Sequence, residues 1–140
     1  MMANSQSANL LSINPSMKNW LFLAGVNGAV AVLAGAFAAH ILGSRLDPRM
    51  LSAFNTAATY HLVHSLALAI AALAARGAAR KRANIAATLF VAGMILFCFS
   101  LYLLALTGWV FLAFATPVGG IAFVAGWITL ATAGLKLETP

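Results

Sequence analysis

Hydrophobic residues occur in four long runs that short polar segments separate. The first run, NWLFLAGVNGAVAVLAGAFAAHIL, covers residues 19–42, and the others cover about 56–75, 84–106 and 118–135. Each run is long enough to cross a hydrocarbon core of roughly 30 Å as a helix that rises about 1.5 Å per residue. The pattern predicts an all-α integral membrane four-helix bundle with short loops, forming a single domain over residues 18–136. Residues 1–17 are rich in Asn and Ser and lack a helical period, which predicts a loose N-terminal tail.

The connection after the first run, GSRLDPRMLSAFN, contains a helix start of its own. Asp47 suits an N-cap and Pro48 the first helical position. Met50, Leu51 and Phe54 then share one side, which predicts a short interfacial helix in the headgroup region.

The connection TGWVFLAFATP at 107–117 is uncharged and rich in aromatic residues. Adding it to the fourth run would exceed the length that one crossing needs. We expect a partly buried interfacial or re-entrant stretch, with Trp109 at headgroup level.

The composition indicates that most of the chain lies in the lipid bilayer, which is therefore its first expected partner. Hydrophobic residues make up 63% and charged residues 7%, and the mean hydropathy is +0.96. A soluble domain carries about 25% charged residues, so this chain lacks the charges to cover a water-facing surface. Lys18 followed by Ala36-Phe37-Ala38 imitates a secretory signal peptide, but the apolar run exceeds the usual length and further apolar runs follow.

The net charge of +6 reflects a few clustered basic residues. Arg76, Arg80, Lys81 and Arg82 lie in one connection, which suits an anionic leaflet and orientation in the membrane. No basic face with interleaved aromatic residues is present in the sequence, so we expect no nucleic-acid partner.

Basic residues also predict the orientation. With four spans, the side that holds both termini has six basic residues: Lys18, Arg76, Arg80, Lys81, Arg82 and Lys136. The opposite side has Arg45 and Arg49. The positive-inside rule therefore predicts that both termini are cytoplasmic.

Small residues recur at helical spacing in two of the runs. Ala31, Gly35 and Ala39 are four apart in the first run, and Ala122 and Gly126 are four apart in the last. Such faces allow close packing in lipid, so we expect them to line grooves on spans one and four. The single cysteine, Cys98, excludes an intrachain disulfide and a CxxC motif.

Polar side chains inside the runs are few. Asn27 lies deep in the first span, where an unpaired amide is costly, so it must face the bundle. An interhelical hydrogen bond is the favoured role, and a transport or ligand role is the alternative.

A polar cluster is predicted near the non-cytoplasmic side. His40 ends the first span, Tyr60, His61 and His64 begin the second, and Thr116 begins the fourth. From helical spacing we expect His64 to face the bundle with Tyr60 beside it, and His61 to lie nearer the headgroups. Ser100 and Tyr102 of the third span lie near that level as well.

Three roles are open for this cluster: a structural polar network, a small-molecule or quinone contact, and a metal or haem site. Imidazoles are sufficient in number for zinc, copper or haem, and His40 and His64 are the candidate ligands. Asp47 is the only nearby carboxylate, and the spacing matches no ligand pattern, so we predict no cofactor.

Four sequence blocks carry a family resemblance: GAFAAHIL at 35–42, TAATYHLVHSLAL at 56–68, LFCFSLYLLALTG at 96–108 and TPVGGIAFVAGW at 116–127. Their order and spacing over residues 20–136 resemble domain of unknown function family 423, a group similar to the eukaryotic transmembrane-protein-256-like proteins. His40, Tyr60 and His64 match the family pattern. Ala38 stands where glycine is usual, and His61 where glutamine is usual. The resemblance implies a four-helix protein of the bacterial cytoplasmic (inner) membrane and supplies no reaction.

We favour a non-enzymatic accessory or scaffold subunit of a membrane complex, with a membrane-protein partner or a homo-oligomer, because the chain is short and has minimal loops. The first alternative is a small-molecule or quinone-binding or transport protein, although no acidic residue lies within a span to couple protons. The second alternative is a metal- or haem-binding redox protein.

Overall fold

The computed structural model describes residues 14–137, and within this range every long element is a helix. Helix α2 comprises Pro15–His40 and α3 comprises Pro48–Ala74. Helix α4 (Arg80–Gly93), a π-helical segment (Met94–Phe99) and α5 (Ser100–Thr107) follow one another without a break. Helix α6 comprises Ala115–Gly134. The described residues thus form four helices long and apolar enough to cross a membrane, which confirms the predicted all-α bundle.

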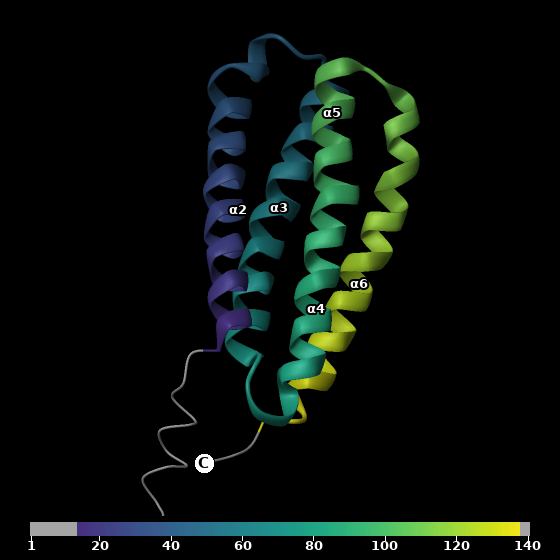
Figure 1. Ribbon diagram of the computed structural model, residues 1–140. Coiled ribbons are helices and arrows are strands. Elements are labelled where there is room, and N and C mark those ends of the chain that lie inside the picture. Colours follow the sequence, from purple (N-terminus) through teal and green to yellow (C-terminus); the bar gives the residue numbers. More distant parts are fainter. Residues whose placement is uncertain (1–13, 138–140) are drawn as a thin grey trace, which may run out of the picture.

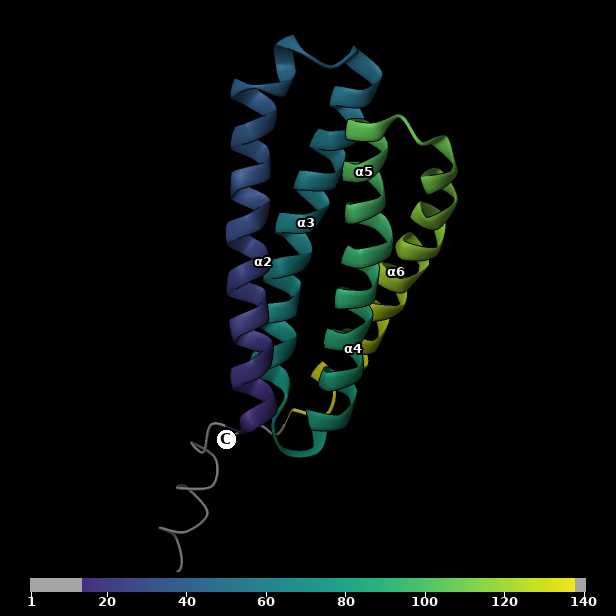
Figure 2. The same ribbon diagram turned by 45° about the horizontal axis from the view of Figure 1, so that its top comes forward.

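The four helices are arranged with α3 and the α4–α5 helix in the middle and the other two on the flanks (Figure 1, Figure 2). Helix α2 packs mainly on α3, and α6 packs mainly on α4 and the π-helical segment. The α2–α3 and α5–α6 connections lie at one end. The α3–α4 turn lies at the other end, with the start of α2 and the end of α6.

Helix α2 begins at an asparagine cap. The Asn14 Oδ1 atom accepts hydrogen bonds from the backbone N–H and the hydroxyl of Ser16, both at 2.8 Å. Its Nδ2 donates to the carbonyl oxygen of Ala75 at 3.2 Å, which ties the start of α2 to the end of α3. The helix therefore begins at Pro15, inside the segment predicted as a tail, and residues 1–13 of that segment lie outside the described residues.

The start signal at Asp47 is confirmed, but the separate interfacial helix predicted at 43–55 is wrong. Asp47 Oδ1 accepts from the N–H groups of Arg49 and Met50, at 2.8 and 3.2 Å. The helix that begins there continues without interruption to Ala74. Its apolar side packs on the bundle instead of the headgroups, because Phe54 is buried against the ring of Tyr102 with centroids 4.7 Å apart.

The α5–α6 connection is mostly exposed. Gly108 adopts a left-handed conformation (φ 73°) that ends α5 and turns the chain away from the bundle. The 3₁₀ helix that follows, Val110–Phe114, leans outward (Figure 1), and Val110 and Phe114 are 72% and 83% exposed. Leu112, Ala115 and Thr116 are half-buried, so only part of the stretch is covered by the bundle. The interfacial or re-entrant position of the stretch and the headgroup position of Trp109 stay predictions.

Glycines set the close approach of α6 to the third helix. A Cβ atom at Gly119 would lie 2.7 Å from the Cβ atom of Phe97 and 2.8 Å from the carbonyl carbon of Leu96, within the π-helical segment. A Cβ atom at Gly126 would lie 2.8 Å from the ring of Phe90. The predicted small-residue packing of the last span is confirmed at Gly126. It is wrong for Gly35 of α2, where an added Cβ would meet nothing within 4 Å.

Candidate functional site

His61 lies at the centre of a hydrogen-bond network that joins three helices. Its side chain is fully buried, with Nε2 2.9 Å from Asn27 Oδ1 and Nδ1 3.3 Å from the Tyr102 hydroxyl. The Asn27 Nδ2 group donates to the Leu23 carbonyl oxygen at 2.8 Å, which directs Oδ1 toward His61. His61 therefore donates from Nε2 to Asn27 and accepts at Nδ1 from Tyr102. This network connects α2, α3 and α5, and it is the interhelical hydrogen bond predicted for Asn27.

His64, one turn along α3, forms a second network toward α6. Its Nδ1 lies 2.7 Å from the Tyr60 carbonyl oxygen, which can only accept, so Nδ1 carries the proton. The Nε2 atom then accepts from the indole N–H of Trp127 at 3.2 Å. The ring of Phe123 stacks on the imidazole with centroids 3.5 Å apart, and Tyr60 stacks at 5.8 Å.

The hydrogen bonds at His61 and His64 select opposite neutral tautomers and occupy all four ring nitrogens. A metal ion or haem iron bound to either residue would replace a hydrogen bond inside the bundle. Among residues 14–137, no group of three or more His, Cys, Asp or Glu side chains is arranged to hold a metal ion. The predicted partner ligand, His40, is exposed at the end of α2. The hydrogen bonds of His61 and His64, and the exposed position of His40, do not fit a metal or haem site built on these three residues.

The position predicted for His61 is wrong. We expected it nearer the headgroups than His64, whereas His61 is fully buried and Tyr60 is 44% exposed. On α3, the positions of Ala57, His61 and Leu68 face the interior, and this rotation carries Tyr60 toward the surface. The sequence did not reveal this rotation, because alanine and leucine occur on both faces of the helix.

The residues of the polar cluster predicted near the non-cytoplasmic side form separate contacts instead of one cluster. Tyr102 belongs to the His61 network, and Tyr60 and His64 form the second network. The hydroxyls of Ser100 and Thr116 lie 3.0 Å apart and join α5 to α6, while Ser100 donates to the Phe97 carbonyl oxygen at 3.0 Å. Within the described residues, His40 takes part in none of these networks.

Two tryptophan contacts were not predicted. Trp127 donates to His64, and Trp20 of α2 donates from its indole N–H to Asn84 Oδ1 of α4 at 3.0 Å. The signal that could have found them is the indole N–H itself, because a donor in an apolar run needs an acceptor on another helix.

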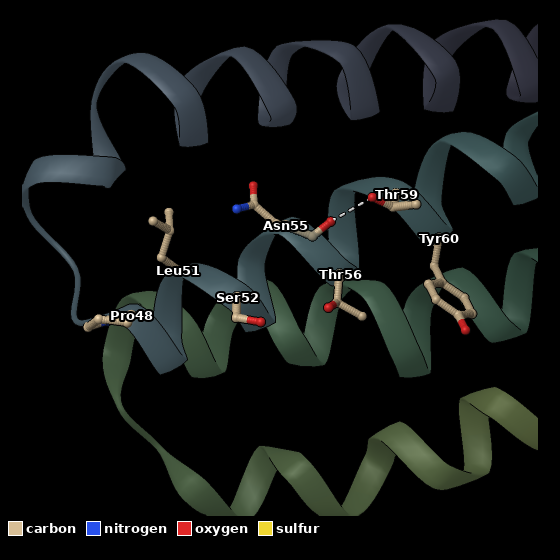
Figure 3. Close-up of a pocket in the computed structure, with 7 residues that line it drawn as sticks. All are labelled: Pro48, Leu51, Ser52, Asn55, Thr56, Thr59 and Tyr60. Atoms are coloured by element: carbon tan, nitrogen blue, oxygen red, sulfur yellow. Dashed lines mark hydrogen bonds between the residues drawn. The ribbon is translucent and has the colours of Figure 1, made fainter.

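A shallow groove of about 470 Å³ runs along α3 near the α2–α3 connection. Its polar lining residues, Ser52, Asn55, Thr56, Thr59 and Tyr60, are all uncharged. Figure 3 shows them along successive turns of α3, with Tyr60 farthest from the α2–α3 connection. A second groove, of about 570 Å³, lies between α2, α3 and α5 and is almost entirely apolar.

Comparison with known proteins agrees with the resemblance of the four blocks. The family model described as "Protein of unknown function (DUF423)" matches residues 34–120, which include the first three blocks and the start of the fourth. A UPF0382 membrane protein of Staphylococcus aureus is 40% identical over 120 residues, covering 86% of this chain and 98% of its own. The UPF0382 membrane protein YwdK of Bacillus subtilis is 36% identical over 121 residues, with the same coverage of each chain. A UPF0382 membrane protein of Haemophilus influenzae is 38% identical over 125 residues, covering 88% and 99%. No solved structure matches the chain.

Proposed function

The chain belongs to the DUF423 family of membrane proteins, and from this premise we propose that it acts without catalysis, as an accessory or scaffold subunit of a membrane complex. The alternatives of a bound small molecule and of catalysis both need polar groups that are free to act on a ligand. The arrangement of polar and apolar side chains in the bundle favours a structural role.

The polar interior supports this proposal because its groups are bonded to one another. Helices α2, α3 and α5 are joined by the hydrogen bonds among Asn27, His61 and Tyr102. Helix α6 is joined to α3 by the hydrogen bond from Trp127 to His64. Every buried side-chain nitrogen or oxygen in residues 14–137 has a hydrogen-bond partner. A buried network satisfied in this way fixes the helices relative to one another.

The one-sided packing of α2 is the observation that carries the proposal. Its buried residues, Ala24, Ala31 and Ala38, are seven apart and form a single line against the bundle. The remaining surface is apolar and open, with Phe22 and Leu33 71% and 69% exposed. Leu33 also lines the apolar groove between α2 and α5. A helix held along one line leaves most of its surface for a helix of a partner.

A photo-crosslinking residue at Leu33, introduced in the full chain in native membranes, tests this proposal. The control is the same residue at Ile95, which is 57% exposed on the π-helical segment. We expect one discrete protein adduct from position 33 and none from position 95, and the same partner in stoichiometric amount after purification in mild detergent. An adduct between two copies would identify the partner as a second copy of this chain. Identical adducts at both positions, with a lone monomer after purification, would contradict the proposal.

The same proposal includes a location, the bacterial cytoplasmic membrane with both termini on the cytoplasmic side. The support is the charge distribution, because Lys18, the 76–82 segment and Lys136 lie at the end of the bundle where α2 begins and α6 ends. Arg45 and Arg49 lie at the opposite end.

A second candidate function is binding of an uncharged small molecule, such as a quinone, in the groove on α3. The groove is supported as a site by its hydroxyl and amide side chains and by Tyr60, whose ring stacks on Phe97 with centroids 4.7 Å apart. A short-chain ubiquinone analogue is a suitable probe, with tryptophan fluorescence as the readout. If the quinone analogue binds in the groove, it should quench tryptophan fluorescence less in a Thr56→Val variant than in a Thr88→Val variant. Thr88→Val is the control, because it removes an exposed hydroxyl from α4, away from the groove. Equal quenching in both variants would exclude the groove.

A further inference from the structure

Three separate parts of the chain meet at the end of the bundle that holds the α3–α4 turn (Figure 1, Figure 2). Asn14 bonds to the carbonyl oxygen of Ala75, which places the start of α2 beside this turn. Ala79 is buried in a small cluster with Ala133 of α6. The Arg82 Nη1 atom donates to the Thr132 carbonyl oxygen at 3.2 Å, which fixes the end of α6 to the start of α4.

This end of the bundle carries a concentrated positive charge. Five basic residues with exposed side chains come from the three parts of the chain: Lys18, Arg76, Arg80, Lys81 and Lys136. Asp47 is the only acidic residue in residues 14–137, and it caps α3 at the opposite end of the bundle. The basic end therefore has no acidic partner within the described part of the chain.

The position of three of the basic residues at the start of α4 adds to the electrostatic repulsion at this end of the bundle. Arg80, Lys81 and Arg82 occupy the first turn of the helix, and no side chain caps its N-terminus. Cations at this position oppose the positive end of the helix dipole, so they destabilise α4 when considered alone. Arg82 is held by α6, whereas Arg80 and Lys81 are exposed. An external anion at this end would offset both the mutual repulsion and the dipole.

We propose that this basic end is a docking surface for the phosphate groups of anionic phospholipids. Guanidinium and ammonium groups are the side chains that bind phosphate most strongly, and basic groups next to a membrane span attract anionic lipid. The basic side chains lie at the ends of apolar helices, where lipid headgroups lie when the hydrocarbon chains contact the exposed apolar face of α6. The lipid thus supplies the negative charge that the described residues do not.

Native mass spectrometry of the full purified chain tests this proposal, with phosphatidylglycerol and phosphatidylcholine added separately. The wild type should retain phosphatidylglycerol in preference to phosphatidylcholine. The double variant Arg80→Gln/Lys81→Gln should lose about tenfold or more of that preference. The matched control, Arg45→Gln/Arg49→Gln, removes the same charge from the opposite end and should keep the preference.

Three outcomes would overturn the proposal. The first is no lipid preference in the wild type, and the second is an equal loss of preference in the two double variants. The third is that inorganic phosphate, added in the same measurement, is retained as well as phosphatidylglycerol. Folding of the variants is checked by circular dichroism, and loss of cations from the first turn should not weaken α4. The measurement uses the isolated chain with added lipid, so its result does not depend on whether the chain has a protein partner.

Discussion

Asn27 of α2 and His61 of α3 are 34 residues apart in sequence, and the Asn27 Oδ1 atom accepts a hydrogen bond from His61 Nε2 at 2.9 Å. The bond is fixed at both ends, by the Leu23 carbonyl on one side and the Tyr102 hydroxyl on the other. In hydrocarbon these groups have no water to replace a lost partner. The stability of this bundle therefore depends on a short series of interhelical hydrogen bonds.

Replacement of His61 by leucine should destabilise the bundle by about 1–3 kcal/mol, because Asn27 Oδ1 and the Tyr102 hydroxyl lose their partner. Replacement by glutamine, the residue usual at this position in the family the sequence resembles, supplies both a donor and an acceptor. We expect His61→Gln to cost less than about 1 kcal/mol. Unfolding in mixed micelles, followed by circular dichroism, measures both values. Equal losses in the two variants would show that the hydrogen bonds contribute nothing beyond packing.

Replacement of Trp127 by phenylalanine removes the donor to His64 and keeps an aromatic ring beside Phe90, whose centroid lies 5.3 Å away. The expected loss is about 0.6 kcal/mol, the average for interhelical hydrogen bonds in a membrane. In a His64→Leu background the same replacement should cost nothing further from this bond, so a double-mutant cycle isolates it. Full additivity of the two single variants would contradict the contact.

Replacement of Gly119 by alanine should separate α6 from the π-helical segment, because the added Cβ meets the backbone of Leu96 and Phe97, which cannot rotate away. We expect a loss of about 1–3 kcal/mol in the same unfolding assay. Gly35→Ala is the matched control, since nothing lies within 4 Å of its Cβ position, and it should be neutral or slightly stabilising. A neutral Gly119 variant would mean that α6 packs less closely than described.

Single-cysteine labelling tests the proposed orientation. Ala78 lies exposed in the α3–α4 turn and Ser44 lies exposed in the α2–α3 connection, while the native Cys98 is buried. With a membrane-impermeant maleimide on intact cells, Ser44→Cys should react and Ala78→Cys should react only after permeabilisation. The reverse pattern would place both termini outside.

The boundaries of the helices could be predicted only in part from sequence. The cap at Asp47 was predicted from residue types, because capping is a local interaction between neighbours in the chain. The union of the predicted short helix and the second span into one helix, α3, was not predicted, because it depends on burial of Phe54 against Tyr102 of a distant helix. The π-helical segment Met94–Phe99 has no counterpart in the sequence pattern, and Gly119 of α6 approaches its backbone closely.

The four apolar helices and their membrane environment could be predicted from the sequence alone, because apolar length and total charge are sums over a segment and do not depend on contacts with other segments. The family was recognised from a resemblance carried by four sequence blocks. The direction in which each side chain points was decided by the tertiary structure. Lipid-facing and bundle-facing positions in a membrane helix are equally apolar, so the sequence carries no amphipathic signal that would separate His61 from Tyr60. Only the packing of α3 against its neighbours turned His61 inward and left His40 on the surface.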